Sequence, residues 1–369
     1  MSTLRTTNLQ HMGSVDPNIV LDNTGGVTFN SGVVVSGDVT ASNIAYRLDT
    51  NTTFHVTTSG NDVSGDGSSA APWATPHRAM EYLSERVITD GVQVIIAVAD
   101  GTYTFTEQLD LGHPNGDQIT ISGQSVTGTR PTGGEAAPNT LNGGNTDTAN
   151  RGNTAASQTY NDNLLTSYYN TVWQFNGSNG LVCRNNGGVT LNRLLIRGDG
   201  SGTGIICGSS YASSPPSSTN GLGNINLGTE VAIHNWNAGI MVFGGQLIGN
   251  LTTISNTAQQ GMLVNRQGAI VIGGVTITNP GNTAVNTTFG GSIYMRNSFL
   301  FNGGSRGVLA DQGGSIDMNT TQVINFGNNG IRTNVGGNIT CRANTISNCA
   351  ASSLMTNFGG VMDATNTTI

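Results

Sequence analysis

The stretch GGSIYMRNSFLFNGGSRGVLADQGGSIDMNTTQVINFGNNGIRTNVGGNI, positions 290–339, decides the fold because its pattern repeats at a constant interval. One glycine marks each repeat, and a second glycine precedes it in the last four repeats. The markers are Gly245, Gly268, Gly291, Gly314, Gly337 and Gly360. A period held through six markers is typical of proteins built from stacked repeats.

Apolar side chains form three columns at the same period. The columns are Leu247, Ile270, Ile293, Ile316, Ile339 and Met362; Ile254, Ile277, Leu300, Val323, Ile346 and Ile369; and Met262, Val285, Val308, Ile331 and Leu354. Side chains alternate along a strand, so Ile272, Met295, Met318, Cys341 and Ala364 are also expected to point inward. The sequence therefore predicts an all-β fold, a right-handed parallel β-helix with three strands in each coil of about 23 residues.

Two kinds of corner are expected between the strands. An unbroken column of asparagines follows the second apolar column by two residues: Asn256, Asn279, Asn302, Asn325 and Asn348. Asparagine tolerates left-handed backbone, and its amide can bond to the same amide in a neighbouring coil, so we predict a structural ladder. The Gly-Gly pairs predict a second corner, because a positive φ costs little in glycine.

The rest of the chain divides into three parts. Residues 1–52 are polar, β-rich and poor in large apolar side chains, and are predicted to form an attachment or oligomerisation segment. Residues 53–131 are predicted to open the β-helix, with a capping helix over 76–89 that begins with Thr75 as N-cap and Pro76 at its first position. Residues 132–369 form the predicted shaft, with loop insertions at 132–170 and 209–223.

Composition excludes several classes of protein. The net charge is -7, and all fourteen basic residues are arginine, so lysine chemistry is absent and a clustered basic face for nucleic acid is not expected. No stretch approaches the roughly 18 apolar residues of a membrane span. The N-terminal sequence MSTLRTTNLQ has no apolar core of a signal peptide, so synthesis in a cytoplasm is expected.

Two segments resemble known proteins. The run TFHVTTSGNDVSGDGSSAAPWATPHRAMEYL (residues 53–83), followed by ADGTY and QITISG, resembles the opening of β-helix proteins of the phage tail-fibre and tailspike type. Related openings occur in some bacterial surface and carbohydrate-active β-helix proteins. The stretch LRTTNLQHMGSVDPNIVLDNTGGVTF (residues 4–29) resembles the start of structural fibre proteins of marine, especially cyanobacterial, phages.

This resemblance implies a virion protein, a tail fibre or tailspike. It implies a homotrimer that docks on other tail or capsid proteins through residues 1–52 and contacts host surface polysaccharide with its β-helix. Synthesis in the host cytoplasm without a signal peptide fits a virion protein. The alternatives are a tailspike depolymerase that cleaves host polysaccharide, since some relatives cleave their glycan receptor, and a bacterial surface adhesin, which requires a secretion signal.

Acidic residues are scarce in the shaft. From Leu164 onward they are Asp199, Glu230, Asp311, Asp317 and Asp363. Asp317 and Asp363 share an outward column two coils apart, which places them about 9.6 Å apart, at the upper limit for an inverting glycosidase pair. Asp311 lies nearby across a Gly-Gly corner, and Tyr294 lies one coil before Asp317 as a possible sugar platform. We expect solvated charges and no enzymatic activity, with Asp311, Asp317 and Asp363 as the candidate catalytic residues and Tyr294 as the candidate glycan contact.

No metal or cofactor is expected. Asn61, Asp62 and Asp66 in SGNDVSGDGSS offer oxygen atoms to Ca²⁺, but the same residue types form tight turns, and a turn is the prediction. The histidines lack ligand spacing, and His234 is predicted to face solvent. Trp173 is predicted to pack in the core, with sugar contact as the alternative.

Trp236 is likewise predicted to pack in the core, with sugar contact as the alternative. Trp73 is predicted to fill the junction between the capping helix and the first coil.

Overall fold

The computed structural model describes residues 46–131, 152, 154–184, 187–208 and 223–369, together with three short strands near the N-terminus. The chain contains two compact units, Met1–Ala45 and Tyr46–Ile369. The strands of the first unit, β1 (Asn8–Leu9), β2 (Ile19–Leu21) and β3 (Val27–Phe29), form an antiparallel sheet. The second unit begins at Tyr46, before the predicted boundary at residue 52.

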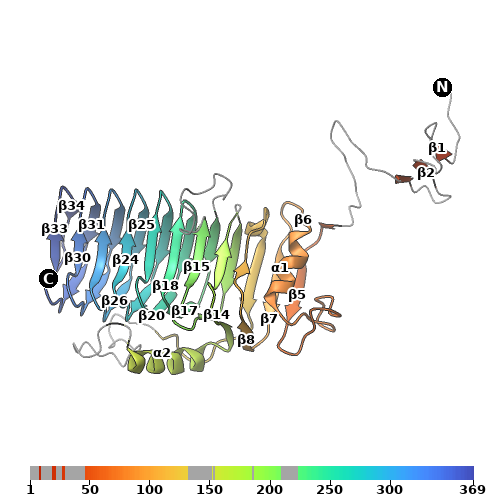
Figure 1. Cartoon of the computed structure of the whole chain (residues 1–369), viewed down its shortest axis with the longest axis horizontal. Helices are drawn as coiled ribbons and strands as arrows, with labels where there is room; N and C mark the ends of the chain where they lie inside the picture. The colour runs from red at the N-terminus through yellow and green to blue at the C-terminus, as the bar shows by residue number, and fades with distance from the viewer. Residues whose placement is uncertain are drawn as a thin grey trace. The chain divides into compact units, whose positions relative to one another are not determined.

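The second unit is a parallel β-helix, as the repeat predicts (Figure 1). In the described residues, eleven strands form sheet 1: β5 (Thr52–Val56), β7 (Val94–Val98), β10 (Ile119–Gly123), β13 (Gly188–Asn192), β16 (Asn224–Leu227), β19 (Gln246–Asn250), β22 (Ala269–Gly273), β25 (Ser292–Arg296), β28 (Ser315–Asn319), β31 (Asn338–Arg342) and β34 (Val361–Asp363). Successive strands come from successive coils, so each coil contributes one strand to this sheet.

Two further parallel sheets complete the coils of the described part of the chain. Sheet 2 contains β8 (Gly101–Phe105), β11 (Thr171–Phe175), β14 (Leu194–Arg197), β17 (Val231–Trp236), β20 (Thr252–Thr257), β23 (Thr276–Thr278), β26 (Phe299–Phe301), β29 (Gln322–Ile324) and β32 (Thr345–Ser347). Sheet 3 contains β9 (Leu109–Asp110), β12 (Leu181–Cys183), β15 (Thr203–Gly208), β18 (Ala238–Phe243), β21 (Met262–Asn265), β24 (Thr283–Thr287), β27 (Arg306–Ala310), β30 (Ile331–Thr333) and β33 (Leu354–Thr356).

Strand register confirms the apolar columns. Ile293 pairs with Ile316, Leu300 with Val323, and each predicted column occupies one sheet. The columns are buried through most of their length, and each fully buried Ile or Leu stabilises the fold by roughly 1.5–3 kcal/mol. Ile369 departs from its predicted place: it lies beyond the last strand and is 70% exposed.

The corners use left-handed backbone. Every member of the asparagine column has a positive φ, from 53° to 63°. Asn348 donates to the side chain of Asn325 over 3.0 Å, and Asn325 donates to that of Asn302 over 2.8 Å. At the Gly-Gly corners the first glycine carries the positive φ, and the second lies against the backbone of the preceding coil, as at Gly336 and Gly337.

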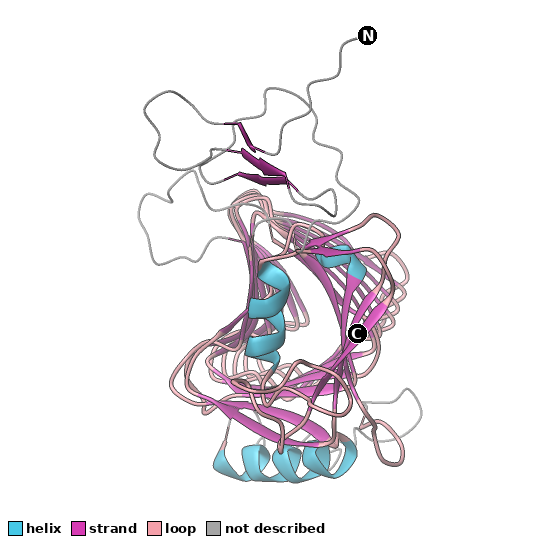
Figure 2. Cartoon of the chain, turned by 90° about the vertical axis from the view of Figure 1, so that its right-hand side faces the viewer, coloured by secondary structure: helices cyan, strands magenta, loops and turns pink. Residues whose placement is uncertain are grey.

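A short helix, α1 (Pro76–Ser84), covers the first coil, and Figure 2 shows it across the N-terminal end of the coils. The Thr75 hydroxyl accepts from the Arg78 amide over 3.2 Å, as expected of an N-cap. The helix ends at Ser84 and not at residue 89. Its predicted last turn instead forms strand β6 (Val87–Ile88), which pairs with β4 (Arg47–Leu48) because these β-branched side chains favour extended backbone.

A second helix, α2 (Ala155–Tyr168), lies within the predicted insertion 132–170. Residues 132–151 and 153 of that insertion, and 209–222 of the other, lie outside the described residues. Asn161 on α2 donates to the ladder side chain of Asn256 over 2.5 Å, and Asn256 donates to the Ser157 hydroxyl over 2.7 Å. The helix is therefore tied to the ladder corner and runs along the coils beside sheet 2 (Figure 1).

No helix in the described ranges has the length and apolar character needed to cross a membrane.

Candidate functional site

The predicted acidic pair lies on the outer face of sheet 1. Strand register places Asp317 beside Thr340 of the next coil and Thr340 beside Asp363 of the coil after it. Tyr294 precedes Asp317 in the same outward column. The structure thus brings Tyr294, Asp317 and Asp363 onto one face, at the spacing of successive strands.

A neighbouring outward column supplies positive charge. Arg296, Asn319 and Arg342 occupy one register position on β25, β28 and β31. The Arg296 guanidinium carbon lies 5.1 Å from the centre of the Tyr294 ring. Tyr294, Arg296, Asp317, Asn319, Thr340, Arg342 and Asp363 are called the C-terminal sheet-1 face below. Guanidinium groups bind carboxylates in two-pronged geometry, so this face can bind an acidic, hydroxyl-rich polymer.

Asp311 lies at the Gly-Gly corner before β28. Its carboxylate accepts from the Gln312 amide over 2.9 Å and from the Asn334 side chain over 3.0 Å. These bonds fix the turn of one coil to that of the next. Asp311 thus shapes the corner beside the C-terminal sheet-1 face and is not part of the outward column.

The loop after β5 is a network of turns. Asn61 accepts from the amides of Val63 and Ser64, and Asp66 accepts from that of Ser68. Asp62 accepts from the Thr75 amide over 3.0 Å and from the Thr75 hydroxyl over 2.7 Å, so it positions the N-cap of α1. No group of three or more His, Cys, Asp or Glu side chains in the described ranges is arranged to hold a metal ion.

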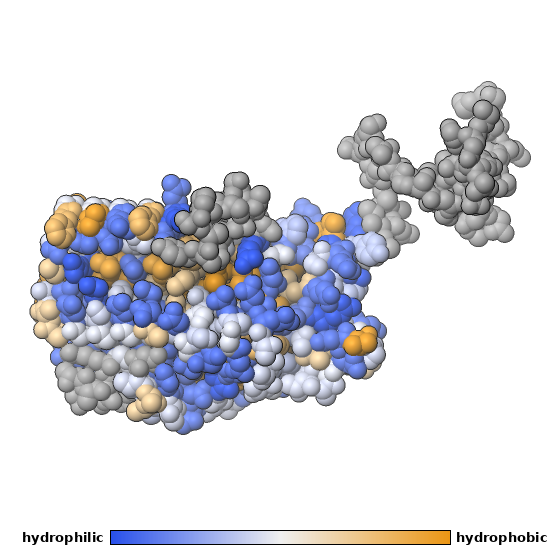
Figure 3. Space-filling model, viewed as in Figure 1, coloured by the Kyte–Doolittle hydropathy of each residue, from blue (hydrophilic) through white to orange (hydrophobic). Residues whose placement is uncertain are grey.

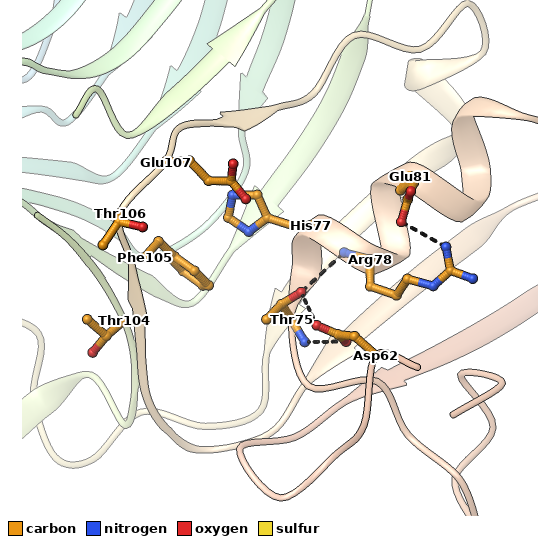
Figure 4. Close-up of a pocket in the computed structure, with 9 residues that line it drawn as sticks. All are labelled: Asp62, Thr75, His77, Arg78, Glu81, Thr104, Phe105, Thr106 and Glu107. Atoms are coloured by element: carbon orange, nitrogen blue, oxygen red, sulfur yellow. Dashed lines mark hydrogen bonds and ion pairs between the residues drawn. The ribbon is translucent and has the colours of Figure 1, made fainter. Parts of the chain in front are cut away.

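A cavity of about 600 Å³ lies between α1 and the segment that continues β8 (Figure 4). Asp62, Glu81 and Glu107 supply carboxylates to it, and His77 and Arg78 supply the nitrogen groups. Figure 4 shows the His77 ring beside Glu107, whereas Arg78 turns to Glu81, with which it forms an ion pair of 2.8 Å.

The environment of His77 suits a proton acceptor. Burial lowers its pKa, while the nearby Glu107 carboxylate acts in the opposite direction. The imidazole is therefore neutral at pH 7. Its Nε2 is shielded from solvent and has no side-chain or backbone partner within hydrogen-bond distance among the described residues, whereas backbone interactions with Glu107 and Gln108 also oppose the effect of burial on the pKa of the ring. A neutral imidazole next to a carboxylate is an arrangement that can act as a general base.

A polar network beneath α2 was not predicted from the sequence. Strand register stacks Gln174, Arg197, His234 and Ser255 on the outer face of sheet 2. Arg197 bonds to the Gln174 side chain and forms an ion pair of 2.8 Å with Asp162 of α2. His234 Nδ1 lies 2.8 Å from the Ser255 hydroxyl, and its Nε2 lies 3.8 Å from Asp162.

The prediction that His234 faces solvent is wrong: its side chain is buried, with 1% of the residue exposed, because α2 covers it. Burial lowers its pKa to about 4, with Asp162 opposing and Arg197 adding to the decrease. Ser255 is also fully buried, so the Asp162–His234–Ser255 arrangement presents no accessible nucleophile. The network holds α2 on the coils.

Acid is expected to weaken the fold through His234. Its folded-state pKa, about 4, lies below the unfolded value of 6.5, so the unfolded chain binds more protons between these values. The free energy of unfolding is therefore expected to fall as the pH decreases from 6.5 to 4, by at most about 3 kcal/mol. Urea unfolding of wild type and His234→Gln at both pH values measures the effect, and equal pH dependence in the two proteins would contradict it.

The tryptophans and cysteines have structural roles. Trp73, Trp173 and Trp236 are buried and pack in the core, so sugar contact by Trp173 or Trp236 does not occur. The cysteines of the chain are all free thiols, and Cys341 occupies the predicted inward position below Met318.

Comparisons with known proteins agree with this architecture. Residues 238–369 match the family model described as right handed beta helix region. No curated protein matches the chain in sequence. A similar solved structure is that of pectate lyase Pel9A, at 13% identity and a TM-score of 0.45, covering 85% of this chain and 79% of that one.

The expectation that the chain has no enzymatic activity is corrected by this comparison, because the structure found to be similar is that of a polysaccharide-cleaving enzyme. At this identity and TM-score the likeness concerns the fold and assigns no role to any residue here. The matched region and the described sheets establish a right-handed parallel β-helix.

Proposed function

We propose that this chain is a phage virion protein of the tail-fibre or tailspike type that contacts host surface polysaccharide with its coils. In this proposal it is a homotrimer and docks on other virion proteins through residues 1–52. The resemblance of residues 4–29 and 53–123 to such proteins supports the virion role. The observation that carries the glycan contact is the C-terminal sheet-1 face, where Arg296 and Arg342 flank polar and aromatic side chains.

Charge indicates which glycans suit this face. Residues 238–369 contain five arginines and three aspartates, although the whole chain carries a net charge of -7. The coils that bear the face are therefore the positive part of an acidic protein. An acidic polysaccharide, with carboxylate groups for the guanidinium groups and hydroxyl groups for Asn319 and the aspartates, is the complementary ligand.

Removing both arginines of the face is expected to weaken binding. Arg296→Ala with Arg342→Ala should raise the Kd for an acidic polysaccharide by about tenfold, since two charge-assisted contacts are lost. Binding to alginate or polygalacturonate is measured by calorimetry at low and high salt, and the difference between variants should shrink with salt.

A matched control removes the same charge from another sheet of the same coils. Arg306→Ala with Arg332→Ala, on sheet 3, should leave binding near the wild-type value. Equal losses in both double variants would show that only net charge matters and would reject the C-terminal sheet-1 face as the contact.

The virion role is tested on purified particles of the phage that encodes the chain. Mass spectrometry should detect this protein at stoichiometric amounts, and antibodies against its coils should label the tail. Particles that lack the chain would overturn the virion proposal and leave the glycan proposal to be judged by binding alone.

A second candidate function, cleavage of the bound polysaccharide, is favoured by one observation. The cavity beside α1 combines a neutral histidine, His77, with the carboxylate of Glu107. This pair provides a proton acceptor, which both hydrolysis and elimination of glycosidic bonds require. The chain would then be a tailspike depolymerase.

A further inference from the structure

One corner of the coils bears bulky side chains in a conformation that disfavours them. Phe289, Gln312, Val335 and Phe358 occupy the position before the first glycine of four successive Gly-Gly corners. Their φ angles are 50°, 48°, 41° and 46°. These four residues, one per coil, are called the corner ridge.

The ridge is also open to solvent. Phe289 is 53% exposed, Val335 48% and Phe358 79%, although large apolar side chains are stabilised by burial. Apolar side chains are gathered along the upper edge of the C-terminal coils in Figure 3. A single exposed apolar residue needs no explanation, but a row at one register position does.

Folding alone gives no reason for these residues. Left-handed backbone is costly for a bulky residue and most costly for a β-branched one such as Val335, whereas glycine and asparagine adopt it readily. The ladder corner of the same coils uses asparagine, and the next residue of this corner is glycine. Left-handed backbone also occurs at Leu251, Thr320 and Ala343 in the corner after sheet 1, so the ridge is distinguished by its row of large exposed apolar side chains in that conformation.

We propose that the corner ridge is a second binding site, on which an acidic glycan lies along the coil axis with its sugar faces against Phe289 and Phe358. The side-chain oxygen of Gln312 already accepts from the Thr288 hydroxyl over 2.8 Å, so in this proposal its side-chain nitrogen donates to a hydroxyl group of the glycan between the two aromatic contacts. This inference rests on the proposed function, because it extends the glycan contact from the C-terminal sheet-1 face to the adjoining corner.

Continuity with the C-terminal sheet-1 face favours a glycan as the occupant. Phe289 directly precedes the Gly-Gly pair that leads into β25, which bears Tyr294 and Arg296, so the ridge and the face border each other. A ridge with one side chain per coil, at the strand spacing of about 4.8 Å, suits an extended polymer with a short repeat.

The test uses substitutions that relieve strain while removing the aromatic faces. Phe289→Asn with Phe358→Asn should give an equal or higher Tm, because asparagine tolerates the backbone and little buried surface is lost. The Kd for alginate or polygalacturonate should nevertheless rise by about tenfold. Dextran, which is uncharged, serves as the comparison polymer.

Leu251→Asn is the matched control. Leu251 also has a positive φ, 51°, and is 41% exposed, but it lies at the corner after sheet 1. Its substitution should stabilise the chain without changing the Kd.

Each outcome decides a different point. If the wild-type chain binds neither acidic polysaccharide, the proposed glycan contact fails and the ridge site fails with it. Unchanged binding in the double phenylalanine variant, with wild-type binding intact, overturns the ridge alone. Retention by vesicles of phosphatidylcholine and phosphatidylglycerol that is lost in this variant, without any effect on glycan binding, assigns the ridge to a lipid surface instead.

Discussion

Replacing Gly337 with alanine is expected to lower the free energy of unfolding by about 3 kcal/mol or more, the range of severe overpacking. A Cβ atom at this position would overlap the carbonyl oxygen of Ala310 in the preceding coil. That oxygen belongs to a strand whose backbone is fixed on both sides by hydrogen bonds, so it cannot move away without breaking the stack. The measurement is urea unfolding followed by circular dichroism.

The adjacent glycine is the control. Gly336 has a φ of 74°, and a Cβ atom there would meet nothing within 4 Å. Gly336→Ala should therefore cost only the strain of left-handed backbone, about 1 kcal/mol. If Gly336→Ala proves the more damaging change, left-handed backbone and not close approach between coils is what the Gly-Gly pair protects against.

This pair of glycines illustrates what the sequence can predict. The constant repeat of the C-terminal coils specifies which side chains stack, because strands in register place residues one period apart above one another. Ile293, Ile316 and Ile339 follow that rule without exception. The helix cap at Thr75 was equally predictable, because capping depends on a few neighbouring residues.

The network beneath α2 was hidden because the upstream coils differ in length. The interval from Gln174 to Arg197 equals the period of the C-terminal coils. The interval from Arg197 to His234 is longer than this period, and the interval from His234 to Ser255 is shorter. A search at a constant period cannot align these four residues. Asp162 contacts them from α2, which is outside the repeat, so the spacing of residues in the coils cannot predict this contact.

The cavity beside α1 was missed for a related reason. His77 and Glu107 lie far apart in the sequence, on a cap and after the end of a strand, and they meet only when the helix closes the first coil. The repeat predicts neighbours only within the regular shaft, so among the acidic residues it singles out Asp317 and Asp363 and not Glu107. The cavity instead lies at the irregular end of the β-helix.

If the second candidate function is correct, His77→Asn is expected to lower kcat for cleavage of an acidic polysaccharide at least 100-fold, roughly the lower end of what general base catalysis contributes. Asparagine has no group that accepts a proton at neutral pH, but it keeps a polar side chain of similar reach. Fragment release from alginate and polygalacturonate is measured by reducing-end assay and by absorbance of unsaturated products. Asp317→Asn is the comparison variant: it leaves the cavity intact, so kcat should be retained, and any effect through binding at the C-terminal sheet-1 face should appear in KM.

Substitution of Glu107 tests whether His77 and Glu107 act as a catalytic pair or are only neighbours. Its carboxylate opposes the effect of burial on His77, so Glu107→Gln should lower the pKa of the imidazole further. The acidic limb of the pH profile of kcat/KM should then move to lower pH, with a smaller maximal rate because the base is weaker. An unchanged acidic limb would mean that His77 is not the titrating base. Loss of activity in Asp317→Asn with full activity in His77→Asn would place the reaction on the C-terminal sheet-1 face. If the wild-type chain releases no fragments, cleavage is rejected, and polysaccharide binding is still tested separately by calorimetry.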